Sequence, residues 1–212
     1  MLELSVRQEL INTARTMNTL GLNQGMSGNL SCRYGDRVLI TPSGVSYEHC
    51  RAGDMVLMDM EGIVVGQGRP SSEWRLHLDI YVSRQEAGAV LHAHSPWCTT
   101  LACMDREIPA FHYMVAMAGG DSIRCASYAV FGSRKLSRQV QLALHERSAC
   151  LMSHHGMICF ADTPAKALDL AVEVENLARI YCQVLQIGKP SLLDRAQMHK
   201  VLLKFSEYRS RS

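Results

Sequence analysis

Two histidines that lie close together, His92 and His94, are the residues of this chain whose type and spacing best suit chemistry. They end a short apolar run over residues 89–93, which predicts a β-strand. Side chains at positions i and i+2 of a strand point to the same face, so the two imidazoles are expected side by side. This pattern fits two ligands of one metal ion, and it also fits two histidines that are hydrogen-bonded at a strand end.

A third candidate ligand lies in the segment Ser153-His154-His155-Gly156, inside an apolar run over residues 150–160 that predicts one strand. Neighbouring residues of a strand face opposite ways, so only one of the two histidines can join a site, and the residues alone leave the choice open. Three histidines and one open position are the arrangement of a catalytic zinc ion. The remaining histidines are interpreted as ordinary surface or core residues, namely His49, His77, His112, His145 and His199.

Glu73 is the best candidate for a catalytic carboxylate. It follows Ser71-Ser72, at the start of a helix predicted over residues 73–84. A glutamate in the first turn of a helix also interacts favourably with the helix dipole, and the residues alone favour that structural role.

Three pairs of small residues could bind an anion, because backbone amides, hydroxyls and a helix start supply partial positive charge without Lys or Arg. Each pair fits an ordinary turn equally well, and none matches a nucleotide-binding motif. The pairs are Gly28-Asn29, Ser43-Gly44 and Ser71-Ser72.

Helix and strand patterns alternate along the chain without a linker or a repeat. Helical spacing and capping signals predict helices over 5–20, 73–84, a segment opened by Ser95-Pro96, 133–146, 164–187 and 194–205. Apolar runs between turn residues predict strands over 38–41, 55–60, 63–65, 89–93 and 150–160. We therefore expect one α/β domain over residues 1–212, with a central mixed or mostly antiparallel sheet flanked by helices.

The charge balance gives no reason to expect nucleic acid or an anionic membrane as a partner. The 212 residues carry 22 basic and 20 acidic side chains, for a formal net charge of +2. No secretory signal and no long apolar run is present, so a soluble, cytoplasmic protein is expected. The eight cysteines form no CxxC pair, which favours reduced, mostly buried thiols.

Five segments in a fixed order are similar to the class II aldolase/adducin family, and most of all to the bacterial L-fuculose-1-phosphate aldolases within it. The resemblance covers nearly the whole chain and weakens beyond about residue 188. The segments are GLNQGMSGNLSCRYGDRVLITPSGV, GRPSSEWRLH, VLHAHSPWCTTLAC, IPAFHYMVAMAGGDSIRCASYAVFGSRKLS and LMSHHG.

The resemblance implies a role for each candidate residue. It makes His92, His94 and His155 the ligands of one Zn²⁺ per subunit, and Glu73 the acid/base at substrate C3. It implies that a neighbouring subunit of a homotetramer offers Tyr113 to the C4 oxygen at an interface active site. A C-terminal tyrosine, matched here by Tyr208 after a one-residue gap, would close over the site. The implied phosphate site is Gly28, Asn29, Ser43, Gly44, Ser71 and Ser72, where Ser43 replaces the family's threonine and keeps its hydroxyl.

The activity implied by the resemblance is the reversible cleavage of L-fuculose 1-phosphate to dihydroxyacetone phosphate and L-lactaldehyde. Alternative substrates are 5-deoxyribulose 1-phosphate and 5-methylthioribulose 1-phosphate, which differ only beyond C4; Phe131 and the C-terminal residues are expected to discriminate among them. A pentulose-phosphate 4-epimerase is a more distant alternative. A non-catalytic adducin-type interaction domain is expected to have lost the metal ligands, which this chain keeps.

Overall fold

Seven strands form one mixed sheet in the computed structural model, which describes residues 2–209 and the side chains of residues 3–207. The strand order is β3-β2-β1-β4-β7-β6-β5, and every neighbouring pair is antiparallel except β5 and β6. This confirms the expected mixed, mostly antiparallel sheet. The strands are β1 (Asn29–Tyr34), β2 (Arg37–Ile40), β3 (Val56–Asp59), β4 (Ala89–Ala93), β5 (Cys125–Ala126), β6 (Ala149–Met152) and β7 (Gly156–Ala161).

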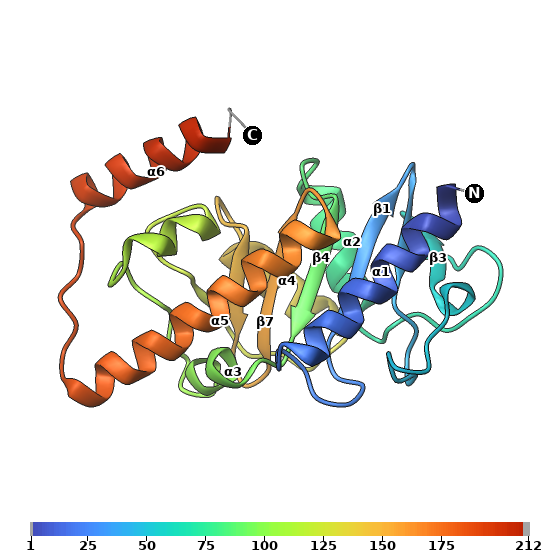
Figure 1. Ribbon diagram of the computed structural model, residues 1–212, viewed down its shortest axis with the longest axis horizontal. Coiled ribbons are helices and arrows are strands. Elements are labelled where there is room, and N and C mark those ends of the chain that lie inside the picture. Colours follow the sequence, from blue (N-terminus) through green and yellow to red (C-terminus); the bar gives the residue numbers. More distant parts are fainter. Residues whose placement is uncertain (1, 210–212) are drawn as a thin grey trace.

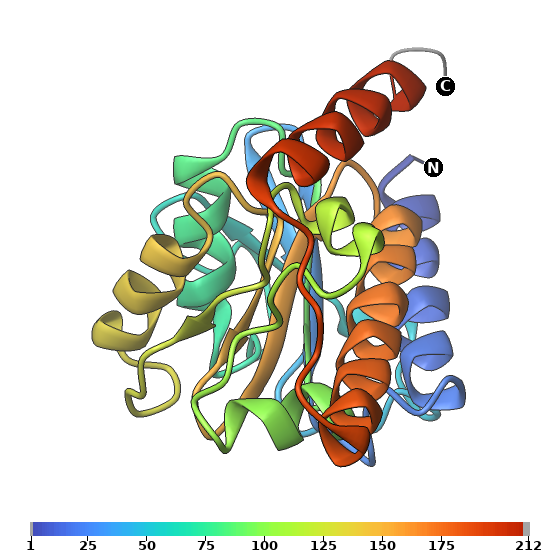
Figure 2. The same cartoon turned by 90° about the vertical axis from the view of Figure 1, so that its left-hand side faces the viewer.

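Helices cover both faces of the sheet (Figures 1 and 2). Helices α1 (Leu2–Thr19) and α5 (Pro164–Ile187) lie on one face, with the short α3 (Pro96–Ala102) packed against α5. Helices α2 (Trp74–Ser83) and α4 (Arg134–Ala143) lie on the other face. The 3-10 helices are η1 (Ala52–Asp54) and η2 (Tyr113–Ala118), and α6 (Arg195–Arg209) packs against η2 after an extended segment.

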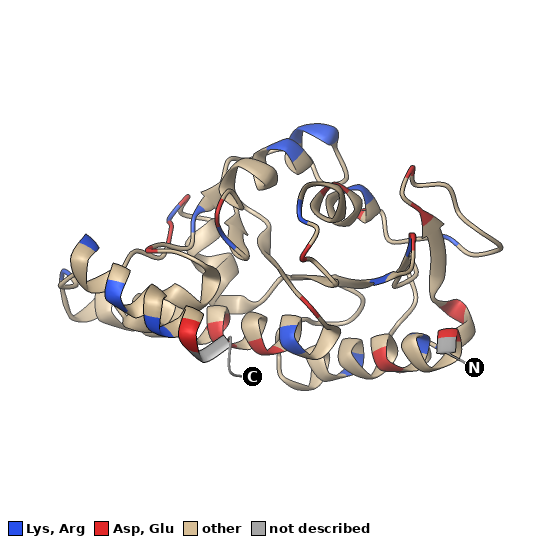
Figure 3. Cartoon of the chain, turned by 90° about the horizontal axis from the view of Figure 1, so that it is seen from above, with Lys and Arg blue, Asp and Glu red and all other residues tan. Residues whose placement is uncertain are grey.

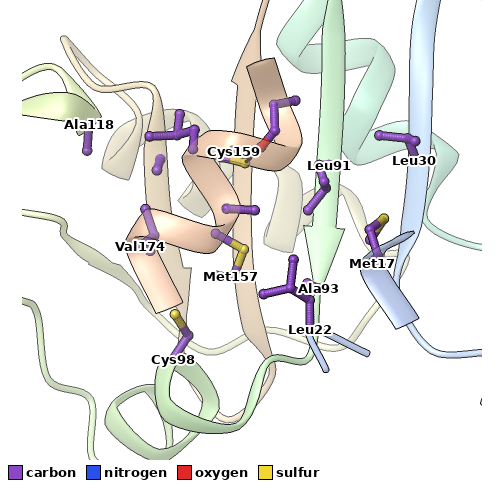
Figure 4. Close-up of a cluster of buried hydrophobic side chains, with 14 of the residues drawn as sticks. Met17, Leu22, Leu30, Leu91, Ala93, Cys98, Ala118, Met157, Cys159 and Val174 are labelled. Atoms are coloured by element: carbon purple, nitrogen blue, oxygen red, sulfur yellow. Dashed lines mark hydrogen bonds between the residues drawn. The ribbon is translucent and has the colours of Figure 1, made fainter. Parts of the chain in front are cut away.

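The hydrophobic core has two parts because strand side chains alternate between the faces of the sheet. In β4, Leu91 and Ala93 face the cluster beneath α1 and α5, which Figure 4 shows, whereas Val90 faces the cluster beneath α2 and α4. His92 therefore points to the α2 side. Asn29 is paired with His92 across the β1–β4 ladder, so its side chain lies on that side too.

The structure corrects several local expectations. Residues 150–160 are not one strand: β6 and β7 form a hairpin, and residues 153–155 are its turn. His154 adopts a left-handed backbone, with φ of 53°, which a continuous strand does not allow. The expected strand over 63–65 is only an isolated bridge between Met58 and Val64, and β1 was not among the predicted strands.

Acidic and basic residues are interspersed along the ribbon in Figure 3, in agreement with the balanced composition. No helix within residues 2–209 is long and apolar enough to cross a membrane. All eight cysteines are free, as expected, and most are buried.

Candidate active site

Three strands and one helix bring their ends together at one edge of the sheet. The start of β1, the end of β4 and the start of β7 are adjacent, because Asn29 pairs with His92 and Ala93 pairs with Met157. Gly156 allows this approach, since a side chain there would lie 2.3 Å from the Ala93 carbonyl oxygen. Helix α2 begins above this edge, so its N-terminal residues face the strand ends.

Glu73, His92, His94 and His155 meet at this edge. One ligand atom from each lies within 4.8 Å of the others, and the three imidazole centroids are 4.7–4.9 Å apart. Glu73 and His92 are buried, His155 is half-buried and His94 is exposed, so the cluster opens on one side. The structure brings together all four residues of the predicted centre, and His155 rather than His154 joins it.

The hydrogen bonds of His92 fix which of its ring nitrogens faces the cluster. Its Nδ1 lies 2.8 Å from the carbonyl oxygen of Met157, which only accepts, so Nδ1 donates and Nε2 carries the free lone pair. That Nε2 lies 3.1 Å from Oε2 of Glu73. Two lone pairs this close repel each other unless a proton or a cation lies between them.

Two buried atoms of the cluster have no hydrogen-bond partner, Nε2 of His92 and Oε1 of Glu73. Oε1 lies 3.3 Å from Nε2 of His155. Buried polar atoms without a partner cost free energy, and a divalent cation bound by three imidazoles and a carboxylate would satisfy them together. The donor set therefore fits the metal site of a metal-dependent enzyme.

The pKa values of the two outer histidines favour the neutral, ligating form. Desolvation of the imidazoles, which is only partial for the exposed His94, is reinforced by His92 and lowers the pKa of both His94 and His155 from 6.5 to about 4. For His92 itself, burial lowers the pKa, but Glu73 and the Met157 carbonyl raise it more, so that the net pKa lies above 6.5.

Glu73 is the N-cap residue of α2, and its side chain caps no amide of the helix. Its carboxylate instead lies beside His92 and His155, contacts that go beyond the helix-dipole role favoured by the residues alone. Burial raises the pKa of its carboxyl, but His92, His155 and a hydrogen bond from Asn29 together lower it well below the usual value. Nδ2 of Asn29 donates that bond to Oε2 over 3.0 Å.

A cavity of about 520 Å³ opens beside the cluster, and the seven predicted substrate-binding residues all line it. These are Gly28, Asn29, Ser43, Gly44, Ser71, Ser72 and Phe131. Backbone hydrogen bonds hold the two serine loops side by side, from Ser43 to Arg69 and from Ser71 to Thr41. None of the described Lys and Arg residues lines this cavity, so amides, hydroxyls and the start of α2 are the groups available for an anion.

An apolar wall, Tyr128, Ala129, Val130 and Phe131, also lines the cavity. The sequence predicted only Phe131 of this wall and missed Tyr128. His154 was missed as well: it lines the cavity from the hairpin turn, with its ring edge-on to that of Tyr128 at 6.0 Å. His154 lies in a turn and Tyr128 in a segment without regular structure, so neither belongs to a periodic sequence pattern that could have predicted it.

Three further histidine and tyrosine predictions have different outcomes. Tyr113, at the start of η2, is half exposed and does not line the cavity of its own chain, so its expected role from a neighbouring subunit stays a prediction. The side chain of Tyr208 lies outside the described residues. His77, interpreted as an ordinary histidine, is fully buried and contacts Asn29.

Comparisons with known proteins agree with this geometry. Residues 8–182 match the family model for the class II aldolase and adducin N-terminal domain. The chain is 52% identical to a 5-methylthioribulose-1-phosphate/5-deoxyribulose-1-phosphate aldolase of Rhodospirillum rubrum, over 97% of this chain and 93% of the relative. It is 47% identical to the L-fuculose phosphate aldolase of Escherichia coli K12, over 95% and 94%.

A solved structure of an L-fuculose 1-phosphate aldolase superposes with a TM-score of 0.92 at 37% identity, over 95% of this chain and 96% of that one. The fold, the metal-type cluster and the relatives are mutually consistent, and the non-catalytic alternative has no support among these relatives. The chain belongs to the class II aldolase and adducin family and is a class II aldolase, a lyase.

Proposed function

We propose that this chain is a zinc-dependent aldolase that reversibly cleaves a ketose 1-phosphate to dihydroxyacetone phosphate and an aldehyde. The observation that carries the proposal is the position of the Glu73–histidine cluster at one end of a cavity whose loops offer amides and hydroxyls. Such a cavity can hold a phosphate at one side and the reacting carbons beside a metal site at the other.

His92, His94 and His155 would hold the ion, with Glu73 as a fourth ligand in the absence of substrate. A bound divalent ion supplies Lewis-acid polarisation of the ketone and lowers the energy of the negative charge that develops there. Zinc suits three imidazoles and a carboxylate, although cobalt or manganese can also use these donors.

The residues of the chain would handle the two proton transfers of the reaction. In cleavage, Tyr113 of a neighbouring subunit takes the proton of the C4 hydroxyl as the C3–C4 bond breaks. The bonding electrons pass to the C2 oxygen, giving the enediolate of dihydroxyacetone phosphate, and Glu73 delivers a proton to C3. The small-residue loops, among them Gly28-Asn29 and Ser71-Ser72, bind the phosphate and so position the reacting carbons.

The aldehyde half of the substrate is the finer question. The 1-phosphates of 5-deoxyribulose, 5-methylthioribulose and fuculose all end in an apolar group, which suits the wall formed by Tyr128, Val130 and Phe131 but does not rank them. The relative at 52% identity is named for the two ribulose derivatives, so we place them first. L-fuculose 1-phosphate, ranked first from the sequence, is the second candidate because of the relative at 47% identity.

We further propose a cytoplasmic homotetramer with its active sites at subunit interfaces. The support is the exposed Tyr113, which lines no part of its own cavity although the resemblance assigns it to the substrate. The open side of the metal cluster at His94 leaves room for residues of another chain. Sedimentation of the purified protein would measure the number of subunits directly.

The test of the substrate is a retro-aldol assay on the purified zinc protein, coupled to detection of dihydroxyacetone phosphate. The panel consists of the 1-phosphates of fuculose, ribulose, 5-deoxyribulose and 5-methylthioribulose. The proposal expects the highest kcat/KM for the last two. A clear preference for fuculose 1-phosphate would reverse the order, and no cleavage of any of the four would contradict the proposed function.

A further inference from the structure

A buried chain of hydrogen bonds runs from the inside of the sheet to the carboxylate of the cluster. The hydroxyl of Tyr81 lies 2.8 Å from Oγ of Ser31, which lies 2.7 Å from Nδ1 of His77. Nε2 of His77 lies 2.5 Å from Oδ1 of Asn29, whose Nδ2 donates to Glu73. All five side chains are buried, and three of them have an exposed fraction of 0%.

The direction of every bond in this chain follows from the ionised carboxylate at its end. Oε2 of Glu73 only accepts, so the Nδ2 end of Asn29 must face it, and Oδ1 of Asn29 must face His77. An amide oxygen also only accepts, so Nε2 of His77 carries the proton. Nδ1 of His77 then accepts from the hydroxyl of Ser31, and Ser31 accepts from Tyr81.

This directionality excludes a proton relay between Glu73 and the interior. An amide NH₂ group has no lone pair that accepts a proton at neutral pH, so Asn29 blocks any transfer from the carboxyl to His77. The chain can hold side chains in place, but it cannot carry the C3 proton. The proton that Glu73 exchanges with C3 therefore does not pass through this chain of hydrogen bonds.

Asn29 is the residue whose orientation matters, because it both contacts Glu73 and lines the cavity. Its amide could rotate by 180° at no cost if only the cavity contacted it. The rotation would place the amide oxygen against the carboxylate and the NH₂ group against Nε2–H of His77, so it would lose two buried hydrogen bonds. One of these two bonds is to Glu73 and the other is to His77, so His77 on α2 adds its own bond to the penalty.

We propose that His77 is a positioning residue, which locks the amide of Asn29 so that Glu73 and the phosphate loop keep a fixed relative geometry. The inference rests on the proposed function only in assigning Glu73 to the C3 proton. His77 belongs neither to the Glu73–histidine cluster nor to the lining of the cavity, and it would act through Asn29. Its neutral Nε2–H tautomer is part of the proposal.

Two substitutions separate this role from simple core packing. His77→Gln can keep the pattern, because a glutamine amide offers a donor to Asn29 and an acceptor to Ser31. His77→Leu fills the space but leaves Oδ1 of Asn29 without its donor, and the hydroxyl of Ser31 keeps only its contact with Tyr81. We expect His77→Leu to lower kcat for C3 hydrogen exchange by about 10- to 100-fold, the range for partners of metal ligands, and His77→Gln to recover most of it.

A double-mutant cycle with Asn29→Ala tests whether His77 acts through Asn29. The measurement is exchange of the C3 hydrogen of dihydroxyacetone phosphate with solvent, which needs no knowledge of the aldehyde. In the Asn29→Ala background, His77→Leu should lower the rate of C3 exchange by less than about threefold, because the amide that His77 is proposed to hold is already absent. Equal losses in both backgrounds would overturn the proposal, since a packing defect acts independently of Asn29.

The matched control is Ser137→Ala, which removes a part-buried hydrogen bond from Ser137 of α4 to Asp79 of α2, and neither residue lines the cavity. It should lower the melting temperature without changing kcat or KM. The tautomer is read separately by NMR of ¹⁵N-histidine-labelled protein. His77 found as the Nδ1–H tautomer would overturn the proposal. If the unchanged protein cleaved no ketose 1-phosphate, that result would refute the proposed function alone, and the tautomer would still test the role of His77.

Discussion

The side-chain oxygen of Asn23 accepts a hydrogen bond of 3.0 Å from the backbone amide of His94. The same side chain fills the space in front of Gly28, where an added Cβ would lie 2.3 Å from Nδ2 of Asn23. One buried residue therefore joins the loop proposed to bind phosphate to a proposed metal ligand. Distances within the site depend on this contact as well as on the strand ladder.

Gly28→Ala should disrupt both sides of the site. The alanine meets Asn23 and also adopts a left-handed backbone, with φ of +73°. Gly25→Ala is the matched control, because φ is +63° there and nothing lies within 4 Å. We expect Gly25→Ala to cost about 1–2 kcal/mol of stability with unchanged KM, and Gly28→Ala to raise KM at least about tenfold in addition. Equal KM values for the two variants would contradict this.

Substitution of each hairpin histidine should show which of the two binds the metal. His155→Ala removes a group 3.3 Å from Glu73 and should lose bound zinc, as should His92→Ala and His94→Ala. His154→Ala should keep a full complement of zinc, because His154 is not part of the cluster. The check is metal analysis of each purified variant, and full zinc in His155→Ala would show that the ligand assignment is wrong.

The two proposed proton carriers should fail at different steps. Glu73→Gln should keep the folded site but abolish exchange of the C3 hydrogen of dihydroxyacetone phosphate. Tyr113→Phe should slow carbon–carbon cleavage more than C3 exchange, because its proposed work is at C4. Isotope exchange and cleavage rates measured on both variants give the comparison. Unchanged C3 exchange in Glu73→Gln would remove that residue from the mechanism.

Phe131→Ala should alter substrate choice with little effect on stability. Phe131 is 66% exposed, so its removal leaves no buried cavity. It forms part of the apolar wall, and its loss should lower kcat/KM for 5-methylthioribulose 1-phosphate by about 10-fold or more. The value for ribulose 1-phosphate, whose terminal hydroxyl gains little from the wall, is the internal control. A parallel fall for both sugars would argue against a role in selectivity.

Acid should destabilise the protein partly through His77. Burial, with a smaller contribution from His92, lowers the pKa of His77 from 6.5 to about 3, against the opposing effect of Glu73. Between these two pKa values the imidazole of His77 binds a proton in the unfolded chain but not in the folded chain, so the protein loses stability as pH falls from 6.5 towards 3. Between pH 7 and pH 5 this amounts to about 2 kcal/mol.

His77→Gln lacks this titration. The free energy of unfolding of the unchanged protein, relative to that of the variant, should therefore fall by about 2 kcal/mol between pH 7 and pH 5. Urea unfolding at several pH values measures the difference. A difference that stays constant with pH would mean that His77 is not held neutral in the folded protein.

The elements and residues of the site that follow local rules could be predicted from the sequence. The pairing of His92 with His94 followed from strand periodicity, and α5 followed from its Thr-Pro start and its Gly end. The family motifs supplied the loop residues that line the cavity. These features depend on residues close together in the chain.

Features that depend on distant residues could not be predicted. The apolar run over 150–160 gave no sign that it folds back at His154, because an apolar hairpin and a single strand have the same composition. The sequence around His77 is that of an ordinary helix histidine, and its proposed role depends on Asn29, which lies 48 residues away on strand β1. The choice between His154 and His155 likewise came from the family resemblance and not from alternation along a strand.

The central claim is that Glu73 and the three histidines form the metal site of a ketose-1-phosphate aldolase. The most direct measurement is the rate of dihydroxyacetone phosphate release from 5-deoxyribulose, 5-methylthioribulose and fuculose 1-phosphates before and after removal of metal by a chelator. We predict that the activity disappears with the metal and returns when one zinc ion per chain is restored, and that it does not return in His155→Ala. Full activity of the metal-free protein, or restoration by zinc in that variant, would contradict the account.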